Sequence, residues 1–347
     1  MTDTKEVFEM ITRTRPDDGA LARQHRRQQH RRRNERALVF AVAAAIVAAS
    51  AVGIVTARRT ARPATSPTPA PAPASTRPVL EAVDVATGAV VTTIATDVAP
   101  YRSDVSPDGT SIAFVRPAAF GHGQIFVMRL DGTHERQVTG LPGQRGCGCG
   151  AIDPAWSPDG TTIAFGGMNL RGGRDIYLLD VATGSIEQLT HTALAGESKP
   201  TWSPDGRSIT FERGTPRRGC CGSETTGSIV VMNLHDGRAA QIVSLPEAAA
   251  PAWSPDGRWI AFSAIRSGGA ADLWLVRPDG SGVRRLIASG TGDETAPAWS
   301  PDGSAIAFDK GQSVAVVDVA SGAVRTVAPI MDASWSGDGR ILYGWRT

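Results

Sequence analysis

Four cysteines are the residues of this chain best suited to covalent or metal chemistry. Cys147 and Cys149 form a Cys-x-Cys pair in a glycine-rich segment, and Cys220 and Cys221 are adjacent. Four thiolates could hold a soft metal such as Cu(I) or Zn(II), but the sequence has no Cys-x-x-Cys zinc motif. An even number of cysteines in an oxidising compartment is typical of disulfides. We therefore expect one or two disulfides, and no metal or cofactor.

Charged side chains outside any regular pattern are the candidates for ligand binding. They are Arg171, Glu197, Arg217, Arg218, Arg266, Asp293 and Glu294. A ring of acidic groups could bind a cation or a basic peptide, and the alternative is that these charges are only solvated. The chain has no Gly-x-Ser-x-Gly nucleophile motif, and its histidines lack metal-ligand spacing. The sequence therefore indicates binding without catalysis.

A five-residue phrase, which reads Trp-Ser-Pro-Asp-Gly in its second copy, organises the rest of the chain. Its six copies begin at Val105, Trp156, Trp202, Trp253, Trp299 and Trp335. Spacings of about 36 to 51 residues indicate a propeller or a solenoid. Pro, Asp and Gly favour a tight turn, and the apolar alternation that follows each phrase indicates a strand. We expect each Asp to stabilise its turn and each Trp to pack between repeats.

The repeats predict an all-β fold, a six-bladed β-propeller in residues 79–347. A second hairpin follows each of the first five phrases, so each repeat should form four antiparallel strands. One more such hairpin, at residues 80–91, precedes the first phrase, whereas only residues 340–347 follow the last one. We expect these two terminal hairpins to join in one blade, which closes the ring and removes its open edge.

Antiparallel strand order predicts which loops share a face of this propeller. The hairpin turns should lie on one face, whereas the blade junctions and the loops between second and third strands should lie on the other. We expect function on the second face, at the mouth of the central channel, where both cysteine segments and the charged candidates fall. The blade junctions add Arg102, Asp104, Asp153, Ser198, Glu247 and Asp332 to the predicted mouth.

The phrase, its leading Trp and the Ile-Ala-Phe that follows it resemble the repeats of the TolB-like six-bladed propellers, which are called WD40-like or PD40 repeats. The resemblance covers the chain from Val79 to its end, with Val105 in place of Trp and Gly337 in place of Pro as departures. It implies a scaffold for protein interaction in the bacterial envelope. A role in the Tol-Pal system is not expected, because an apolar segment and not an α/β domain precedes these repeats.

Residues 37–57 are predicted to form one transmembrane helix. The segment contains no charged residue, and its length in a helix would cross roughly 30 Å of hydrocarbon. A cleaved signal peptide is the alternative, but the 36 residues before the segment, most of them polar, argue against it. Arginines are concentrated in residues 23–36, so the positive-inside rule places residues 1–36 in the cytoplasm. Residues 58–78, rich in Pro and Ala, should form an extracytoplasmic linker.

These predictions combine into a single-pass protein of the cell membrane with a monomeric propeller outside the cytoplasm. The propeller should bind an envelope protein, a peptide or another envelope ligand without catalysis. Nucleic acid is not an expected partner, because the repeats contain no basic stripe. One alternative is a sensor that relays ligand binding to the cytoplasmic tail. Another is an envelope enzyme similar to polysaccharide lyases, which requires His, Arg and metal ligands at the channel mouth.

Overall fold

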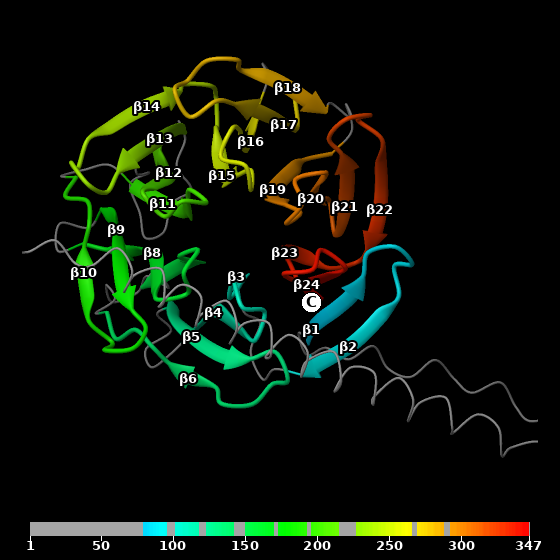
Figure 1. The fold of residues 1–347 in the computed structure, drawn as a ribbon, viewed down its shortest axis with the longest axis horizontal. Coiled ribbons are helices and arrows are strands. Elements are labelled where there is room, and N and C mark those ends of the chain that lie inside the picture. Colours follow the sequence, from blue (N-terminus) through cyan, green and yellow to red (C-terminus); the bar gives the residue numbers. More distant parts are fainter. Residues whose placement is uncertain are drawn as a thin grey trace, which may run out of the picture. The chain divides into compact units, whose positions relative to one another are not determined.

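The computed structural model describes nine segments of the chain, residues 79–95, 101–117, 123–141, 150–169, 173–192, 196–214, 227–265, 269–287 and 292–346. All of them lie within one compact unit, Pro73–Thr347. The elements in these segments are all strands, arranged around a central axis (Figure 1). No helix of the described residues is long and apolar enough to span a membrane. The predicted span, residues 37–57, lies outside them.

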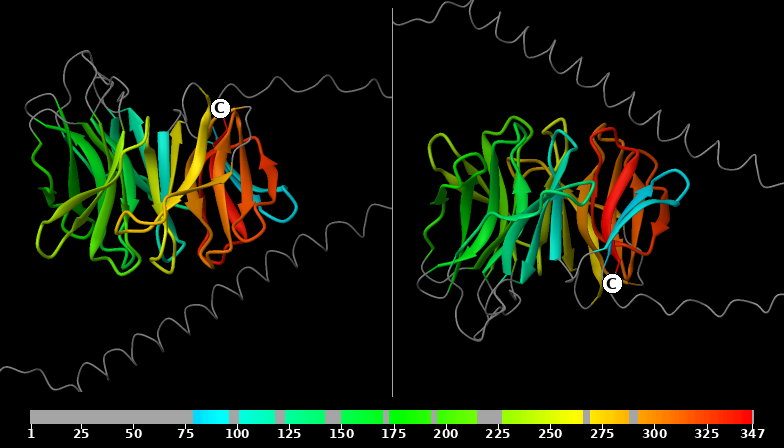
Figure 2. Two further views of the ribbon diagram at one scale, coloured as in Figure 1. Left: turned by 90° about the horizontal axis from the view of Figure 1, so that it is seen from above. Right: turned by 90° about the horizontal axis from the view of Figure 1, so that it is seen from below.

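Three four-stranded sheets follow the chain from the axis outward, and all of their neighbouring strands are antiparallel. The first consists of β3 (Tyr101–Val105), β4 (Ser111–Pro117), β5 (Gly123–Arg129) and β6 (Arg136–Gln137). The second consists of β15 (Ala249–Trp253), β16 (Ile260–Ile265), β17 (Ala271–Val276) and β18 (Arg284–Ile287). The third consists of β19 (Glu294–Trp299), β20 (Ala305–Lys310), β21 (Ser313–Asp318) and β22 (Val324–Ala328). Seen from the side, the strands run between the two faces of the ring (Figure 2).

A fourth four-stranded sheet joins the two ends of the described chain. It contains β1 (Val79–Asp84), β2 (Val90–Ala95), β23 (Met331–Trp335) and β24 (Ile341–Arg346), in the order β2-β1-β24-β23. β1 and β24 pair antiparallel without interruption, from Val79 opposite Arg346 to Asp84 opposite Ile341. The predicted closure of the ring by the two terminal hairpins is therefore confirmed.

The remaining eight strands form one sheet and not two, which differs from the prediction of six separate blades. They are β7 (Ala151–Trp156), β8 (Thr162–Met168), β9 (Arg174–Asp180), β10 (Ile186–Gln188), β11 (Gly196–Trp202), β12 (Ser208–Gly214), β13 (Ser228–Asn233) and β14 (Ala239–Val243). A parallel bridge between Gly196 and Arg174 connects the two halves. β10 is short and pairs only with residues 177–179 of β9, so the first residue of β9, Arg174, is left open to Gly196 of β11.

The core lies mainly between neighbouring sheets. Each of β4, β8, β12, β16 and β20 contributes one fully buried phenylalanine, Phe114, Phe165, Phe211, Phe262 and Phe308. A typical cluster packs Leu273 and Leu275 of β17 against Ile306 and Phe308 of β20. Because each sheet buries its faces against the next one, an isolated sheet of this kind would expose apolar surface on both sides.

The five repeated Trp residues pack between neighbouring repeats, as the sequence predicts, and three of them also donate a hydrogen bond to an adjacent innermost strand. The indole N–H of Trp202 donates to the carbonyl of Ala155, and that of Trp299 donates to the carbonyl of Ala252, both at 3.1 Å. In the same way, Trp335 donates to the carbonyl of Ala298 at 2.9 Å. Each acceptor belongs to the innermost strand of the preceding repeat, so these indoles hold adjacent innermost strands together.

The repeated Ser and Asp residues of the phrase form the same turn six times. In one copy, the Ser300 hydroxyl donates to Asp302 at 2.7 Å and accepts the backbone N–H of Ala305 at 2.9 Å. The five other phrases have both of these bonds. The prediction that the aspartates serve turns is confirmed.

We predict that Ser300→Ala lowers the free energy of unfolding by about 1–3 kcal/mol, because the backbone N–H of Ala305 loses its acceptor. Ser300 is 4% exposed, whereas Ser304 lies on the surface of the same turn. Ser304→Ala is the matched control and should cost less than about 0.5 kcal/mol. Urea denaturation measures both variants, and equal losses would contradict the role assigned to the Ser300 hydroxyl.

Candidate functional site

Each innermost strand contains a β-bulge that turns one residue toward the ring axis. The pairing register shifts within β3, β7, β11, β15, β19 and β23. At every shift one residue has a φ of 48–52°, which is left-handed backbone that residues other than glycine rarely adopt. The six residues are Arg102, Asp153, Lys199, Ala250, Ala296 and Asp332. Each lies three positions before the first residue of its phrase.

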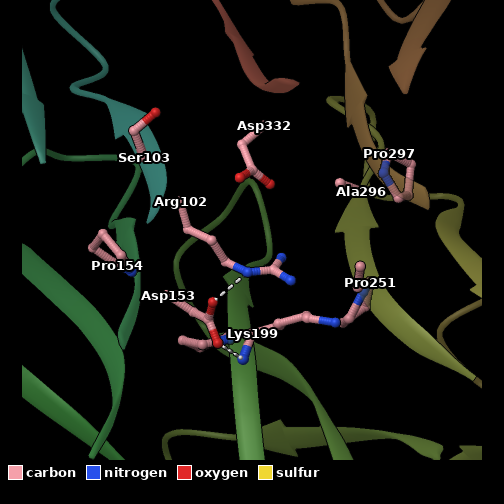
Figure 3. A pocket seen from close by; sticks show the side chains of 11 residues that line it. Arg102, Ser103, Asp153, Pro154, Lys199, Pro251, Ala296, Pro297 and Asp332 are labelled. Carbon is pink, nitrogen blue, oxygen red and sulfur yellow. Dashed lines mark hydrogen bonds and ion pairs between the residues drawn. The ribbon is translucent and has the colours of Figure 1, made fainter. Parts of the chain in front are cut away.

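These six residues surround a pocket on the axis of the ring (Figure 3). The residues that follow five of them, Ser103, Pro154, Pro200, Pro251 and Pro297, complete its lining. The pocket has a volume of about 130 Å³. It can hold several water molecules or the end of one side chain, but it is smaller than the roughly 300 Å³ at which pockets for drug-sized ligands begin.

A chain of ion pairs lines one side of the pocket. The Nε atom of Arg102 lies 2.7 Å from Oδ1 of Asp153, and the backbone N–H of Lys199 donates to Oδ2 of Asp153 at 3.3 Å (Figure 3). The Lys199 ammonium lies 3.1 Å from Glu212 of β12. Glu212 also accepts the Ser198 hydroxyl at 2.7 Å and the backbone N–H of Ala250 at 3.1 Å. Carboxylates thus bind both the cations and the left-handed backbone.

Asp309 of β20 and Asp332 form a second carboxylate group at the pocket. The backbone N–H of Asp332 donates to Oδ1 of Asp309 at 3.0 Å. Burial, and then the negative charge of Asp332, raise the pKa of Asp309 to about 7, against the opposing effects of the Asp332 N–H and of Arg102. Burial would lower the pKa of Arg102, but the surrounding carboxylates, Asp153 first, raise it above its ordinary value. Arg102 therefore stays charged.

The charges around the pocket do not balance. The cations Arg102 and Lys199 face four carboxylates, those of Asp153, Glu212, Asp309 and Asp332. Although burial would raise the pKa of Glu212, Lys199 and three further partners hold it below its ordinary value. The pocket therefore carries two excess negative charges when all four carboxylates are ionised, and one when Asp309 holds a proton.

The opposite side of the pocket is apolar. It consists of Ala250 and Pro251 of β15 and Ala296 and Pro297 of β19. Figure 3 labels Pro251, Ala296 and Pro297 on this side. Because the six equivalent positions carry different side chains, the pocket has a charged side and an apolar side. A ligand that enters it is therefore oriented by both.

The predicted mouth residues Arg102, Asp153 and Asp332 line this pocket, so that part of the prediction is confirmed. The six axial residues do not form a ring of acids, because two of them are basic and two are alanine. Asp104 does not line the pocket. Its carboxylate accepts the backbone N–H of Trp156 at 2.7 Å, and burial raises its pKa to about 7.

Three other candidates lie away from the pocket lining. Glu197 is fully buried, where Thr190 and Arg213 bind its carboxylate, and burial raises its pKa. Glu294 is 1% exposed, and Asp293 is an exposed residue that accepts the backbone N–H of Ala271 at 3.0 Å. The remaining candidates, Arg171, Arg217, Arg218, Arg266 and the four cysteines, lie outside the described residues.

Sequence reasoning missed Lys199, Glu212 and Asp309. Lys199 could have been found from the register of the repeat, because it occupies the position three before Trp202 that Arg102, Asp153 and Asp332 occupy in their own repeats. Glu212 and Asp309 each follow the buried phenylalanine of a second strand, a position that is valine in the first repeat and glycine in the second. A carboxylate there is a departure from the repeat that the sequence makes visible.

We predict that Asp309→Asn makes the protein more stable than the wild type above pH 7. The folded state holds the Asp309 proton up to pH about 7, whereas the unfolded chain releases it near the ordinary value of 3.8. The free energy of unfolding of the wild type therefore falls as the pH rises from about 4 to about 7, by up to about 4 kcal/mol from this group. Asparagine keeps an acceptor for the Asp332 N–H but cannot ionise. Urea denaturation across this pH range measures the difference.

Asp279→Asn is the control, and it should change the free energy of unfolding in the opposite direction. The Ser281 hydroxyl and N–H lower the pKa of Asp279, so the stability that its ionised carboxylate adds is present at neutral pH and is lost as the pH falls. This variant should be less stable than the wild type at neutral pH. If Asp309→Asn follows the pH dependence of the wild type, the carboxyl of Asp309 is ionised in the folded state and the assignment is wrong.

Comparisons with known proteins agree with this fold. The PD40 model, described as the TolB β-propeller domain, matches residues 80–219 and 223–344. An uncharacterized protein of Agrobacterium fabrum is 30% identical over 190 residues, 54% of this chain and 44% of that protein. A solved structure of a TolB candidate from Agrobacterium tumefaciens has a TM-score of 0.63 at 24% identity, covering 78% of this chain and 98% of that one. A manganese-bound oligogalacturonate lyase has a TM-score of 0.53 at 18% identity, covering 77% and 78%.

The two solved structures are under 25% identical, so they show a shared fold alone. The chain spans less than half the length of the curated relatives that it matches first. The family model, in contrast, covers more than half of this chain and contains all six phrases. The chain therefore belongs to the PD40 family of TolB β-propeller domains.

Proposed function

We propose that this chain is a non-catalytic, monomeric binding scaffold of the bacterial envelope, whose central pocket receives a basic side chain from a protein or peptide partner. The observation that carries the proposal is the small axial pocket with excess negative charge. A pocket of about 130 Å³ accommodates the end of a side chain and excludes a folded segment. The family description supports a propeller of the TolB type.

The two sides of the pocket match the two parts of a lysine or arginine side chain. The charged head would lie near Asp332 and Asp309 and compensate the excess negative charge that buried groups leave there. The aliphatic stem would lie along Ala250, Pro251 and Ala296. An acidic side chain would add to the excess charge and is disfavoured.

We predict that Asp332→Asn weakens peptide binding at least about tenfold, because it removes one negative charge from the pocket at unchanged size. Peptides are first selected from a random displayed library on the full chain and should be rich in Lys and Arg. Their affinities are then measured for the wild type, Asp332→Asn and Asp293→Asn. The last variant removes an exposed carboxylate outside the pocket lining and should bind like the wild type. Equal affinity for all three proteins would exclude the pocket as the binding site.

The location of the protein is part of the same proposal. Residues 37–57 would anchor it in the cell membrane with the propeller outside the cytoplasm, and the support is the uncharged segment with its preceding arginines. We predict that the full chain stays with the membrane fraction after alkaline carbonate extraction, whereas a variant that lacks residues 37–57 is released. Release of the full chain would contradict the anchor.

We also propose six blades as the finer description of the fold. Each half of the eight-stranded sheet contains four antiparallel strands in chain order and one copy of the phrase, as a separate sheet does. The single parallel bridge at Gly196 would then be a contact between two adjacent blades.

An enzyme of the polysaccharide-lyase class is the second candidate. Its support is the fold shared with an oligogalacturonate lyase and the presence of two basic side chains, Arg102 and Lys199, in the pocket. Arginine can neutralise a uronate carboxylate and lysine can act as a base. Unsaturated uronate products absorb in the ultraviolet, so incubation with polygalacturonate separates the candidates. The binding proposal expects no product, and product formation that Lys199→Met abolishes would replace it.

A further inference from the structure

Trp259 lies on the face that carries the hairpin turns, at a position where most other repeats have a small residue. It occupies the second position after the phrase glycine, immediately before β16. The equivalent positions in four other repeats hold the small residues Ser111, Thr162, Ser208 and Ala305. A residue that every repeat shares serves the fold, so a large aromatic residue present once requires a separate explanation.

Two arginines lie against the ring of Trp259. Arg277 follows β17 and Arg284 begins β18, and the pairing of Ile260 with Val276 and of Leu275 with Arg284 brings these strand ends beside Trp259. The guanidinium carbon of Arg277 is 5.4 Å from the centre of the ring, and that of Arg284 is 5.2 Å from it. Both distances are within the range of cation–π attraction, which holds the two guanidinium groups on one ring.

The turn between the two arginines supports this arrangement. Gly282 has a φ of 67°, and a Cβ atom there would lie 3.5 Å from the Trp259 indole and 3.7 Å from the Arg277 stem. The chain at Gly282 therefore approaches the indole closely. Trp259 is half-buried, whereas Arg277 and Arg284 are exposed. The ring thus provides a fixed support under two side chains that reach solvent.

Neither guanidinium forms an ion pair with another of the described residues. Asp272 pairs with Arg285 at 3.1 Å, and Asp256 approaches Arg258 at 3.9 Å. Asp279 accepts the backbone N–H of Ser281 at 2.9 Å within its own turn. The N–H donors of Arg277 and Arg284 are therefore available to a ligand, although Asp256 and Asp279 offset part of the local positive charge.

We propose that Arg277 and Arg284, held by Trp259, bind phosphate groups of an anionic polymer. A planar carboxylate matches the fork of one guanidinium, whereas a tetrahedral phosphate has enough oxygens to accept from two. One exposed ion pair contributes little affinity, so useful affinity requires a ligand with several phosphates in a row. This surface is separate from the axial pocket, and the proposal goes beyond the binding function proposed for that pocket.

The first repeat contains a matched control for this surface. Arg129 and Arg136 have the same spacing as Arg277 and Arg284, and both are exposed. The turns also share a backbone bond, from Arg129 to Thr133 at 2.8 Å and from Arg277 to Ser281 at 2.9 Å. Ser111 takes the place of Trp259 in that repeat. The two pairs of arginines therefore differ in the aromatic support, while the net charge removed by a double substitution is the same.

The test measures binding of fluorescently labelled linear polyphosphate to the full chain in non-ionic detergent at low salt. The wild type should bind, with an affinity that falls as salt rises. The double variant R277A/R284A should bind at least about tenfold more weakly, whereas R129A/R136A should remain within about twofold of the wild type. Trp259→Leu should weaken binding with both arginines still present. Thermal melting verifies that each variant is folded.

Four outcomes would overturn the proposal. They are the absence of polyphosphate binding by the wild type, equal losses in the two double variants, equally tight binding of polyglutamate, and binding of phosphatidylglycerol vesicles in preference to polyphosphate. The second would mean that bulk charge decides the affinity, the third that the surface does not select phosphate, and the fourth that its ligand is a lipid headgroup. None of these results depends on peptide binding in the axial pocket.

Discussion

The pairing of β1 with β24 is the contact on which the other features of this ring depend. Each sheet buries its faces against its neighbours, so the packing is complete only when the first and last segments meet. The axial pocket depends on the same contact, because Arg102 comes from the first phrase repeat and Asp332 from the last. Closure also pairs the backbone groups of β1 and β24 that would otherwise form an open edge.

Within the closed ring, the same carboxylates stabilise the left-handed backbone and determine the charge of the pocket. The backbone N–H groups of Lys199, Ala250 and Asp332, all left-handed residues, are bound by Asp153, Glu212 and Asp309 respectively. Each carboxylate comes from the sheet region that precedes its partner in the chain. Left-handed backbone costs of order 1–3 kcal/mol per residue, and such hydrogen bonds help to offset that cost. A change of charge at the pocket therefore also changes the support of the backbone.

The fold could be predicted in large part because its determinants are local and repeated. Pro, Asp and Gly in each phrase specify a turn, and the alternation after Trp156 or Trp299 specifies a strand, so the number and order of hairpins follow from the sequence. The joining of β9 and β11 into one sheet was not predictable in this way. It depends on the short pairing of β10 and on the approach of Gly196 to Arg174, neither of which has a repeated signal.

The site was predictable only in part, because the charge of a residue at a blade junction does not tell whether its side chain lies between repeats or faces the pocket. Glu197 and Glu294 are acidic residues at blade junctions, as are Asp153 and Asp332, yet the first two lie five positions before their Trp, are at most 1% exposed and do not line the pocket. Two positions further along the strand, the β-bulge turns the side chain to the axis. The position of a residue relative to the Trp of its phrase therefore decides whether its side chain faces the pocket. Selecting charged junction residues without regard to this position included Glu197 and omitted Lys199.

Repetition also explains how one scaffold can carry the two separate binding surfaces that we propose. Six equivalent axial positions with identical residues would form a symmetric pocket, whereas Arg, Asp, Lys, Ala, Ala and Asp divide it into a charged and an apolar side. On the hairpin face, one change from a small residue to Trp259 is enough to gather two arginines that the equivalent turn of the first repeat leaves without an aromatic support. Because the shared residues maintain the fold, such departures can accumulate at positions where the turn and the core do not require a particular side chain. The hairpin face, which the repeated phrase marks as structural, can for this reason carry a function in a single repeat.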